Sequence, residues 1–251
     1  MLWQLAASTL WAMVPSSLDS LLTIASRQHD PETLRALETR LGQRLEHSYQ
    51  VTVRDRVAMI PVVGPLFRYA NLFTRISGAT SYEVLAQDIT HVLDSDEVDA
   101  LILVLDSPGG EVNGCAELAS LIFEARGQKP IAAYVSGDAA SGAYWIASAC
   151  DEIIVSSTSG LGSIGVVGTY RSQENDAHSI EIVSSQSPFK RLDVAVDEDR
   201  QRLQVRMDAL ASVFVQSVAD YRSVSVDTVL EHFGQGDVLI VSAKAITHYP
   251  R

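Results

Sequence analysis

The sequence predicts an α/β fold in which the strands of a mostly parallel sheet alternate with helices. Short apolar runs at 57–63, 101–105, 131–135 and 152–155 have the length and composition of buried strands. Between these runs, apolar residues recur every three or four positions, as they do on one face of a helix. Alternation of this kind builds βαβ units, in which ligands bind at the carboxyl ends of the strands.

Turn signals separate the predicted elements of this domain. The strand at 57–63 runs into a Gly-Pro turn, and a loop is expected as far as residue 79. Ser81 is predicted to start a helix, because apolar residues follow it at helical spacing. The strand at 101–105 ends in D-S-P-G-G. Further helices are predicted at 112–122, after residue 141 and at 203–218, and a further strand at 180–184.

The first 48 residues are predicted to form an N-terminal helical segment ahead of one domain at 49–251. Ser17 can cap a helix with leucines on one face, and Asp30-Pro31 can open a second helix. The apolar stretch at 2–14 lacks a basic region before it, and polar residues interrupt it well short of the roughly 20 apolar residues of a membrane span. We expect a packing or docking segment there and no membrane anchor.

Composition and charge narrow the function classes. The chain is 47% hydrophobic, as expected of a globular protein with a sizeable core. Nineteen basic and thirty-one acidic side chains give a net charge of -12, which argues against nucleic-acid binding as a main role. The two cysteines, Cys115 and Cys150, indicate a reduced, intracellular protein without a disulfide framework. Neither lies in a metal-ligand spacing, so no metal is expected.

Ser141 lies in the segment G-D-A-A-S-G-A-Y-W-I-A-S-A-C-D, between a predicted strand and a predicted helix. One interpretation is a helix cap, since a serine hydroxyl can accept a hydrogen bond from a free amide of the first turn. The other is a nucleophile, which needs a base, an oxyanion hole and room for substrate. The two roles are compatible, and we expect Ser141 to have both.

The glycine pair Gly109-Gly110 closes the strand that precedes this one in the chain. Adjacent glycines let the backbone turn tightly and present free amides, which suits an anion or an oxyanion. An ordinary strand-to-helix turn would look the same in sequence. The position of Ser141 at the end of the next strand favours the catalytic interpretation.

The base is harder to assign from the residues. None of the six histidines has an evidently catalytic setting, and His178, in a polar loop, is better explained as solvated. Lys190, in S-S-Q-S-P-F-K-R, follows a predicted buried strand and a proline. A desolvated lysine loses its proton more easily and can act as a general base, whereas most lysines are solvated surface charges. Both interpretations of Lys190 stay open at this point.

Three motifs in order resemble the signal peptide peptidase A family of serine–lysine peptidases. They are D-S-P-G-G-E-V-x-G, then A-A-S-G-A-Y-W-I-A-S-A-C-D, then G-S-I-G-V-V, and the resemblance covers about 57–245. The family shares the Clp protease/crotonase-like fold of repeated β-β-α and βαβ units. Within it the chain is similar to the phage and prophage branch, the head-maturation or capsid-processing proteases, by its I-V-S-S-Q-S-P-F-K-R and V-D-T-V-L-E-H-F-G-Q-G-D-V-L-I segments.

The resemblance implies roles for individual residues. Ser141 matches the nucleophile and Lys190 the general base, and the amides of Gly110 and Gly142 match the oxyanion hole. The strand that borders the substrate cleft matches Gly162, Ser163, Ile164, Gly165 and Val166, with Gly109 also beside the cleft. The Clp protease has a histidine in the strand that corresponds to G-S-I-G-V-V. This chain has none there, in agreement with a lysine base.

The resemblance also implies a mechanism and partners. Neutral Lys190 would take the Ser141 proton as the hydroxyl attacks a peptide carbonyl, and water would hydrolyse the acyl-enzyme. Neither metal nor cofactor is implied. The expected substrates are phage head proteins (capsid, scaffold or portal) and the protease's own tail. The expected assembly is a homo-oligomeric ring in the bacterial host cytoplasm or on the procapsid, without nucleic acid.

The sequence departs from the family pattern near its C-terminal end. Ser223 and Val241 stand where family members commonly have glycine, and the ending H-Y-P-R replaces a Gly-Leu-x-Asp-like one. If those glycines serve turns with positive φ, a β-branched valine there is costly. An altered or truncated C-terminal edge is therefore expected.

Three alternatives to a phage head protease remain. One is a catalytically silent scaffold or capsid-assembly protein that keeps the fold, which the altered C-terminal end favours and the intact Ser141, Lys190 and glycine pair oppose. Another is a cellular peptidase that degrades signal peptides. The third is a crotonase-type acyl-CoA enzyme, which also uses paired amides but has no stated use for Ser141 together with Lys190.

Overall fold

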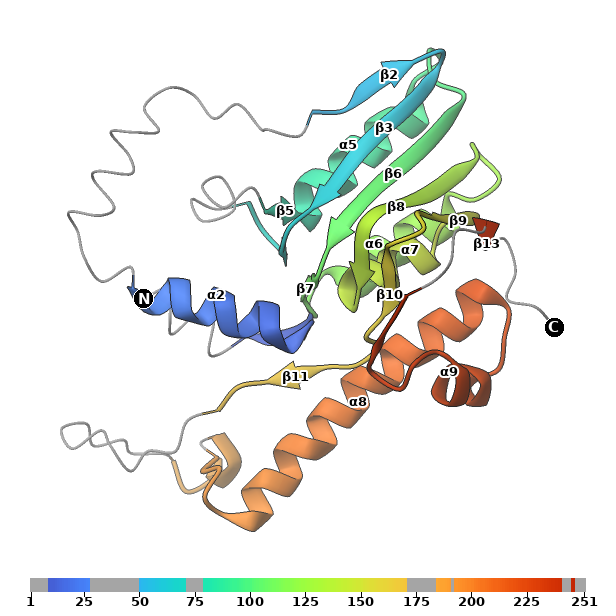
Figure 1. Cartoon of the computed structure of the whole chain (residues 1–251). Helices are drawn as coiled ribbons and strands as arrows, with labels where there is room; N and C mark the ends of the chain where they lie inside the picture. The colour runs from blue at the N-terminus through green and yellow to red at the C-terminus, as the bar shows by residue number, and fades with distance from the viewer. Residues whose placement is uncertain are drawn as a thin grey trace.

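The computed structural model describes residues 9–27, 50–70, 79–170, 184–190, 192–240 and 245–246, which form two sheets and several helices (Figure 1). The larger sheet contains β2 (Thr52–Arg54), β3 (Val57–Val63), β6 (Ala100–Ser107), β8 (Ile131–Ala140), β9 (Glu152–Val155), β10 (Gly160–Gly162), β12 (Val238–Ile240) and β13 (Ala245–Ile246). The smaller sheet contains β1 (Leu10–Met13), β4 (Leu66–Phe67), β5 (Thr80–Ser81), β7 (Gly109–Glu111) and β11 (Val167–Gly168). The helices are α2 (Pro15–Arg27), α5 (Tyr82–Asp94), α6 (Cys115–Glu124), α7 (Gly142–Ser148), α8 (Asp197–Arg222), α9 (Val226–His232) and the 3-10 turn η2 (Pro188–Lys190).

The centre of the larger sheet is parallel, as predicted. Its order is β12-β10-β8-β6-β3-β2, with β9 also paired to β8, and the contacts among β3, β6, β8, β9 and β10 are all parallel. Strand β6 buries Leu101, Leu103 and Leu105 almost completely. Helices α5, α6 and α7 lie along one side of this sheet in Figure 1, and β3 and β6 alternate buried with mostly half-buried residues, so one face of these strands is covered more deeply than the other.

The chain repeats a β-β-α unit. Strand β3 is followed by the short strands β4 and β5 of the smaller sheet and then by α5, and β6 is followed by β7 and then by α6. The smaller sheet has the order β11-β1-β7-β4-β5. The expectation of an α/β fold of the Clp protease/crotonase-like type is therefore confirmed. Strands β6 and β8 are parallel neighbours, so their carboxyl ends lie side by side, where ligands bind in such folds.

Most predicted elements are confirmed, and two need correction. The predicted strand at 57–63 is β3, and that at 152–155 is β9. The N-terminal segment is not helical throughout, because residues 10–13 form β1, and its helix α2 begins at Pro15 rather than being capped by Ser17. Proline at a first helical position loses no hydrogen bond. The predicted helix from Asp30 and almost all of the predicted strand at 180–184 lie outside the described residues.

Helix α7 is fixed at its C-terminal end by two arginines. Arg126 donates to the carbonyl oxygens of Ser148, Ala149 and Cys150, and Arg222 donates to that of Cys150 at 3.0 Å. Cations at this end satisfy the last carbonyls and oppose the negative end of the helix dipole. Desolvation, and the charge of Arg222, lower the pKa of Arg126.

Helix α8 holds α7 from the side. The ring of Phe214 stacks on Trp145 with centroids 4.3 Å apart, and both side chains are buried. Only the C-terminal part of α8 makes this contact, and its N-terminal half runs past α7 (Figure 1). In the described part of the chain, no helix is long and apolar enough to cross a membrane.

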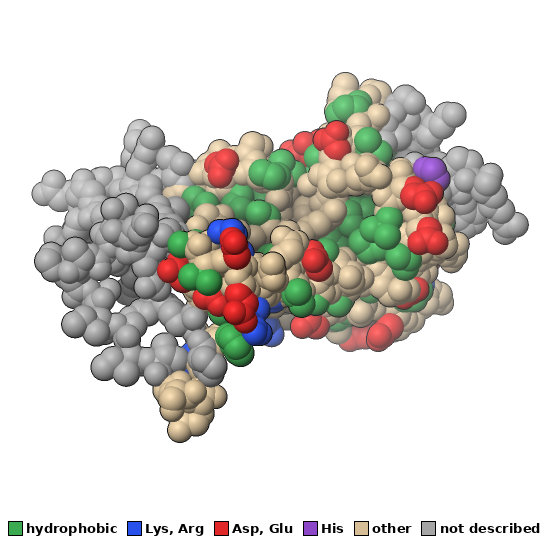
Figure 2. Space-filling model, turned by 90° about the horizontal axis from the view of Figure 1, so that it is seen from below, with side chains coloured by type: hydrophobic (Ala, Val, Ile, Leu, Met, Phe, Trp, Pro, Cys, Tyr) green, Lys and Arg blue, Asp and Glu red, His purple; other side chains and the backbone are tan. Residues whose placement is uncertain are grey.

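The surface reflects the acidic composition. Figure 2 shows acidic side chains scattered over the face seen there, while basic ones gather in a small part of it. The two cysteines are free and buried, as the sequence predicts. Arg56 and Asp99 form an ion pair at the surface, at 2.6 Å between side chains that are more than half exposed, so it stabilises little.

Ser223 has the backbone conformation that was suspected from the family pattern. It ends α8 with φ 55° and ψ 43°, in the left-handed region that glycine adopts without strain. Two residues later, Ser225 caps α9, and its hydroxyl accepts a hydrogen bond from the Thr228 amide at 3.1 Å. Val241, the other departure, lies outside the described residues.

The substitution Ser223→Gly is expected to raise the free energy of unfolding by about 1 kcal/mol, because glycine removes the left-handed strain. Ser225→Ala is the matched control and should lower it by about 1 kcal/mol, because the helix cap is lost. Urea denaturation of the three proteins measures both changes. A destabilised Ser223→Gly variant would contradict the strain at this turn.

Candidate active site

Ser141 sits on a strained turn between β8 and α7. Its φ of 52° and ψ of -118° are unusual for a residue with a side chain, and such conformations cost on the order of 1–3 kcal/mol. The turn is held on both sides: the Ser141 amide donates to the Gly162 carbonyl at 2.7 Å, and its carbonyl accepts from the Trp145 amide at 3.0 Å. Serine nucleophiles of hydrolases are found on sharp strand-to-helix turns of this kind.

The prediction that Ser141 caps its helix is confirmed for the position of the residue but not for the hydrogen bond of its side chain. The residue occupies the cap position of α7, but its hydroxyl makes no capping hydrogen bond. It instead lies 3.5 Å from the Gly165 carbonyl oxygen, at the limit of a hydrogen bond. The positive φ turns the side chain away from the first turn of the helix. The hydroxyl is therefore not tied to α7 and is available for chemistry, although the residue is only 1% exposed.

The predicted glycines meet Ser141 in a crevice that leaves no room for side chains. A Cβ on Gly109, whose φ is 97°, would lie 2.1 Å from the Ala12 carbonyl oxygen and 2.9 Å from the Gly142 nitrogen. A Cβ on Gly110 would lie 2.0 Å from the Leu66 carbonyl oxygen. The structure thus brings the backbone of Gly110 and Gly142 together beside Ser141, the arrangement that an oxyanion hole needs.

The Gly110 amide is not free, which the sequence did not indicate. Strand β1 pairs antiparallel with β7, with Ala12 opposite Gly110. Hydrogen-bonded pairs alternate along such a ladder, and the Val14 amide donates to Pro108 while the Val112 amide donates to Leu10. The pair midway between them, Ala12 and Gly110, is therefore hydrogen-bonded, and Gly110 donates to the Ala12 carbonyl. The contact of Ala12 with Gly110 has no signal in the sequence, because a four-residue strand leaves almost no periodic pattern.

The segment expected to border the cleft is close to Ser141, but it is not one strand. Strand β10 ends at Gly162, residues 163–166 are irregular, and β11 starts at Val167. Ser163 has φ 54°, and its amide donates to the backbone carbonyl oxygen of Asp237 at 2.7 Å. The pairing of β10 with β8 ends one residue earlier, at Gly162. The irregular stretch lets the Gly165 carbonyl turn toward the Ser141 hydroxyl.

Lys190 is neither buried nor beside Ser141. It ends η2 with an exposed side chain, which agrees with the solvated interpretation of Lys190 and not with the desolvated one. Its neighbour Phe189 lies under the guanidinium of Arg202, 3.5 Å from atom to ring centroid. Arg202 precedes Phe214 by twelve residues, so η2 lies about 18 Å along α8 from the contact with α7. Within the described residues, no hydrogen bond or ion pair joins Lys190 to Ser141.

Other groups near Ser141 do not compete with it as nucleophiles. The Cys115 thiol donates to the Gly142 carbonyl at 3.3 Å, and burial raises the pKa of this thiol to about 12. It therefore stays protonated at neutral pH, and only the thiolate is nucleophilic. Burial also raises the pKa of Tyr82, whose hydroxyl donates to the Glu111 carbonyl at 2.8 Å.

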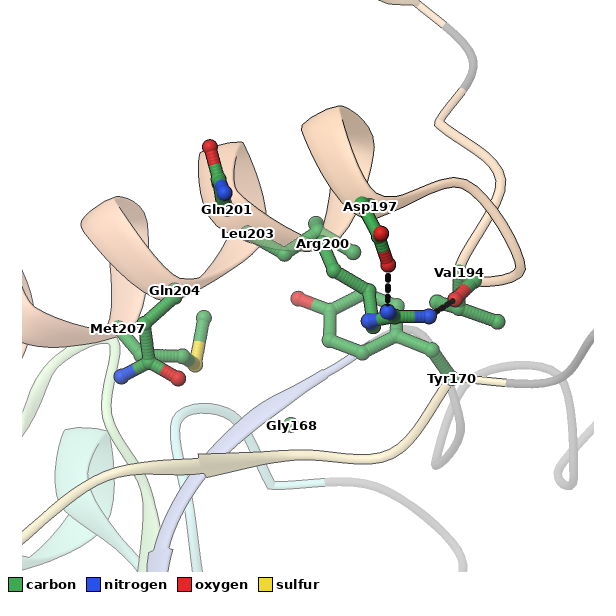
Figure 3. Close-up of a pocket in the computed structure, with 9 residues that line it drawn as sticks. All are labelled: Gly168, Tyr170, Val194, Asp197, Arg200, Gln201, Leu203, Gln204 and Met207. Carbon is green, nitrogen blue, oxygen red and sulfur yellow. Dashed lines mark hydrogen bonds and ion pairs between the residues drawn. The ribbon is translucent and has the colours of Figure 1, made fainter.

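A hollow of about 420 Å³ lies on the other side of β11, against the N-terminal half of α8 (Figure 3). Its walls include Tyr170, Leu203 and Met207. The guanidinium of Arg200 crosses it and is engaged by Asp197 and by the Val194 carbonyl. None of the lining residues is a serine, cysteine, histidine or lysine. The polar groups of the hollow are those of Tyr170, Asp197, Arg200 and two glutamines, and Asp197 is engaged by Arg200.

Comparison with known proteins places the chain among peptidases. The model of peptidase family S49 matches residues 124–247, which contain Ser141, Gly142 and Lys190. The head-tail preconnector protein GP5 of Enterobacteria phage P21 is 32% identical over 195 residues, and the capsid assembly protease C of Escherichia phage lambda is 31% identical over 228 residues. These alignments cover 75% and 82% of this chain but only 38% and 51% of the two phage proteins.

Bacterial and structural relatives extend the comparison. Protease 4 of Salmonella typhi is 30% identical over 168 residues, which cover 64% of this chain and 27% of that protein. Among solved structures, an enoyl-CoA hydratase from Shewanella pealeana has a TM-score of 0.45 at 11% identity, covering 82% of this chain and 66% of that one. The membrane-bound stomatin-specific protease 1510-N has a TM-score of 0.41 at 15% identity, covering 75% and 70%. By its sequence relatives, the chain belongs to peptidase family S49.

Proposed function

We propose that the chain is a serine peptidase in which Ser141 is the nucleophile. The observation that carries the proposal is the strained conformation of Ser141, whose hydroxyl does not cap α7 and which lies beside the crevice of Gly110 and Gly142. Backbone strain persists where the surrounding structure over-determines it, and functional sites are where it gathers. Membership of a peptidase family supports the same role.

The proposed reaction is acyl transfer through a Ser-Lys dyad. The Ser141 hydroxyl attacks a peptide carbonyl, its proton passes to neutral Lys190, and the amides of Gly110 and Gly142 hold the oxyanion. Lys190 then protonates the leaving amine, and water hydrolyses the acyl-enzyme. The exposed position of Lys190 on η2 requires that this segment approach Ser141, either within the chain or from a neighbouring copy in the proposed ring.

The proposed substrates are phage head proteins. Support comes from the phage relatives, of which one is named a capsid assembly protease and one a head-tail preconnector protein. The chain spans about half or less of the length of these relatives, so what their remaining parts contribute is outside the comparison. Cleavage of arbitrary peptides tests whether the chain is a peptidase without assuming which protein is its natural substrate.

Cleavage of a mixed peptide library, followed by mass spectrometry, tests the dyad. We expect Ser141→Ala to lower the rate by about 10⁴-fold or more and Lys190→Ala by about 10²- to 10⁴-fold. Lys190→Arg is the matched control: it keeps the positive charge but cannot give up a proton, so it should be as impaired as the alanine variant. Wild type that is folded yet as inert as Ser141→Ala would refute the peptidase and leave a silent scaffold protein.

Mixing the two inactive variants locates the base. Each Ser141→Ala chain keeps its lysine and each Lys190→Ala chain keeps its serine. Cleavage that returns on mixing would show that the base comes from a neighbouring copy. Cleavage that stays absent would show that the dyad forms within one chain.

The substitution Gly142→Ala tests the oxyanion hole. Its Cβ would lie 3.2 Å from the Ala12 carbonyl oxygen and 3.4 Å from the Gly110 nitrogen, where a substrate oxygen is expected. Activity should fall by about 10²- to 10³-fold. The free energy of unfolding should change by less than about 1 kcal/mol, because the gain in helix propensity opposes the tight contact of the new Cβ with the Ala12 carbonyl oxygen. Thermal unfolding and peptide cleavage are measured on the same sample. Full activity with normal stability would exclude Gly142 from the hole.

A further inference from the structure

Strand β1 fills the space between the two strands that flank the candidate site. It pairs antiparallel with β7 on one side, through Trp11, Ala12 and Met13, and with β11 on the other. Strand β1 is the element that joins β7 to β11, so the smaller sheet is continuous because the chain's own N-terminal segment completes it. Extended peptides bind to proteins in the same way, by adding a strand to a sheet edge.

The register of β1 places a peptide carbonyl in the proposed oxyanion hole. The Ala12 carbonyl accepts the Gly110 amide, as the alternation of the ladder requires. The same oxygen is the nearest atom to a Cβ built on Gly142, at 3.2 Å. One carbonyl thus lies against both glycines whose amides are proposed to hold the oxyanion, beside Ser141.

The side chains of β1 alternate between two surroundings. Ala12 is fully buried in the main core beside the site, while Trp11 and Met13 point to a separate cluster. That cluster contains Leu18, Leu21 and Leu22 of α2, and Phe67, whose ring meets Trp11 edge-on at 5.8 Å. Ala12, whose carbonyl lies at the proposed oxyanion hole, has a small side chain, and Trp11 and Met13 on either side of it pack into the separate cluster.

We propose that β1 occupies the peptide-binding groove of this site as a substrate strand would, with the Ala12–Met13 bond in the position of the scissile bond. The inference rests on the proposed function, because it uses Ser141 and the glycine amides as the catalytic groups. Two properties of the site follow. Substrates bind as an extended strand with a small residue, such as alanine, glycine or serine, in the place of Ala12. The N-terminal segment competes with them and must leave the groove first.

The attachment of β1 is suited to release. The strand has only four residues, and its two large buried side chains, Trp11 and Met13, lie in the small cluster with Phe67 and α2, whereas only Ala12 and the partly buried Leu10 contact the main core. Small satellite clusters open at lower free energy than a domain core. Ser141 is 1% exposed while β1 is in place, and we expect it to become accessible when β1 leaves the groove.

A reversible lock tests the proposal in the full chain. Trp11 and Glu111 face each other in a non-hydrogen-bonded pair, where Cα atoms are close enough for a disulfide. The double variant Trp11→Cys/Glu111→Cys should cleave peptides when reduced and lose at least tenfold in kcat/KM when oxidised. The reduced form is its own control, and each single variant should be indifferent to reductant. The native thiols are buried, and burial raises both pKa values to about 12, so they do not interfere.

A binding measurement separates this inference from the catalytic one. A fluorescent peptide of residues 9–15, T-L-W-A-M-V-P, is titrated into the same double variant carrying Ser141→Ala. Binding to the reduced form that weakens at least tenfold on oxidation supports the groove, even if no form of the enzyme cleaves peptides. Equal binding by both redox forms, or measurable cleavage that is equal in both, would overturn it. Release of a fragment that ends at Ala12 by wild type, and not by Ser141→Ala, would support it as well.

Discussion

The close approach of backbone segments around Gly109 and Gly110 is the constraint on which the site depends. Backbone atoms from β1, from β4, from the end of β8 and from the start of α7 come within contact distance of a Cβ built on these two residues. A side chain at either position would overlap a carbonyl oxygen, so only glycine is compatible with this packing. What converges in the crevice is therefore backbone, and backbone amides are fixed donors that need no reorganisation.

The strain at Ser141 is sustained by packing some distance from it. Helix α7 has only seven residues, too few to be stable alone, yet its C-terminal carbonyls are held by Arg126 and Arg222 and its side by Phe214. These contacts fix the helix as a rigid body, and the Gly162 carbonyl holds the Ser141 amide from the sheet side. A serine held from both directions keeps a conformation that an isolated turn would relax.

In the proposed assignment, the described conformation combines a positioned nucleophile with a groove that is already occupied. The hydroxyl, the glycine amides and a peptide carbonyl are assembled, but the carbonyl belongs to the chain itself. The base that the family pattern assigns stands at the far end of α8. Under the proposed mechanism, two separate segments, β1 and η2, have to change position before a foreign peptide can be cut, so the fraction of chains in which both have moved sets the basal rate. Such an arrangement restricts cleavage to conditions that move both segments.

The sequence alone determined the α/β class, the principal strands and the glycine and serine motifs, because these depend on local periodicity and short-range turn chemistry. It also indicated the left-handed turn at Ser223, since glycine is the usual residue at such a turn. Only the tertiary structure decided that residues 10–13 form a strand, that Ala12 binds the Gly110 amide, and that Lys190 is exposed. Pairing between residues about 100 positions apart, such as Ala12 and Gly110, is set by the global fold. A strand of four residues has too little sequence pattern to predict which strand it pairs with. The burial of a lysine likewise depends on what packs over it, which no neighbouring residue in the sequence specifies.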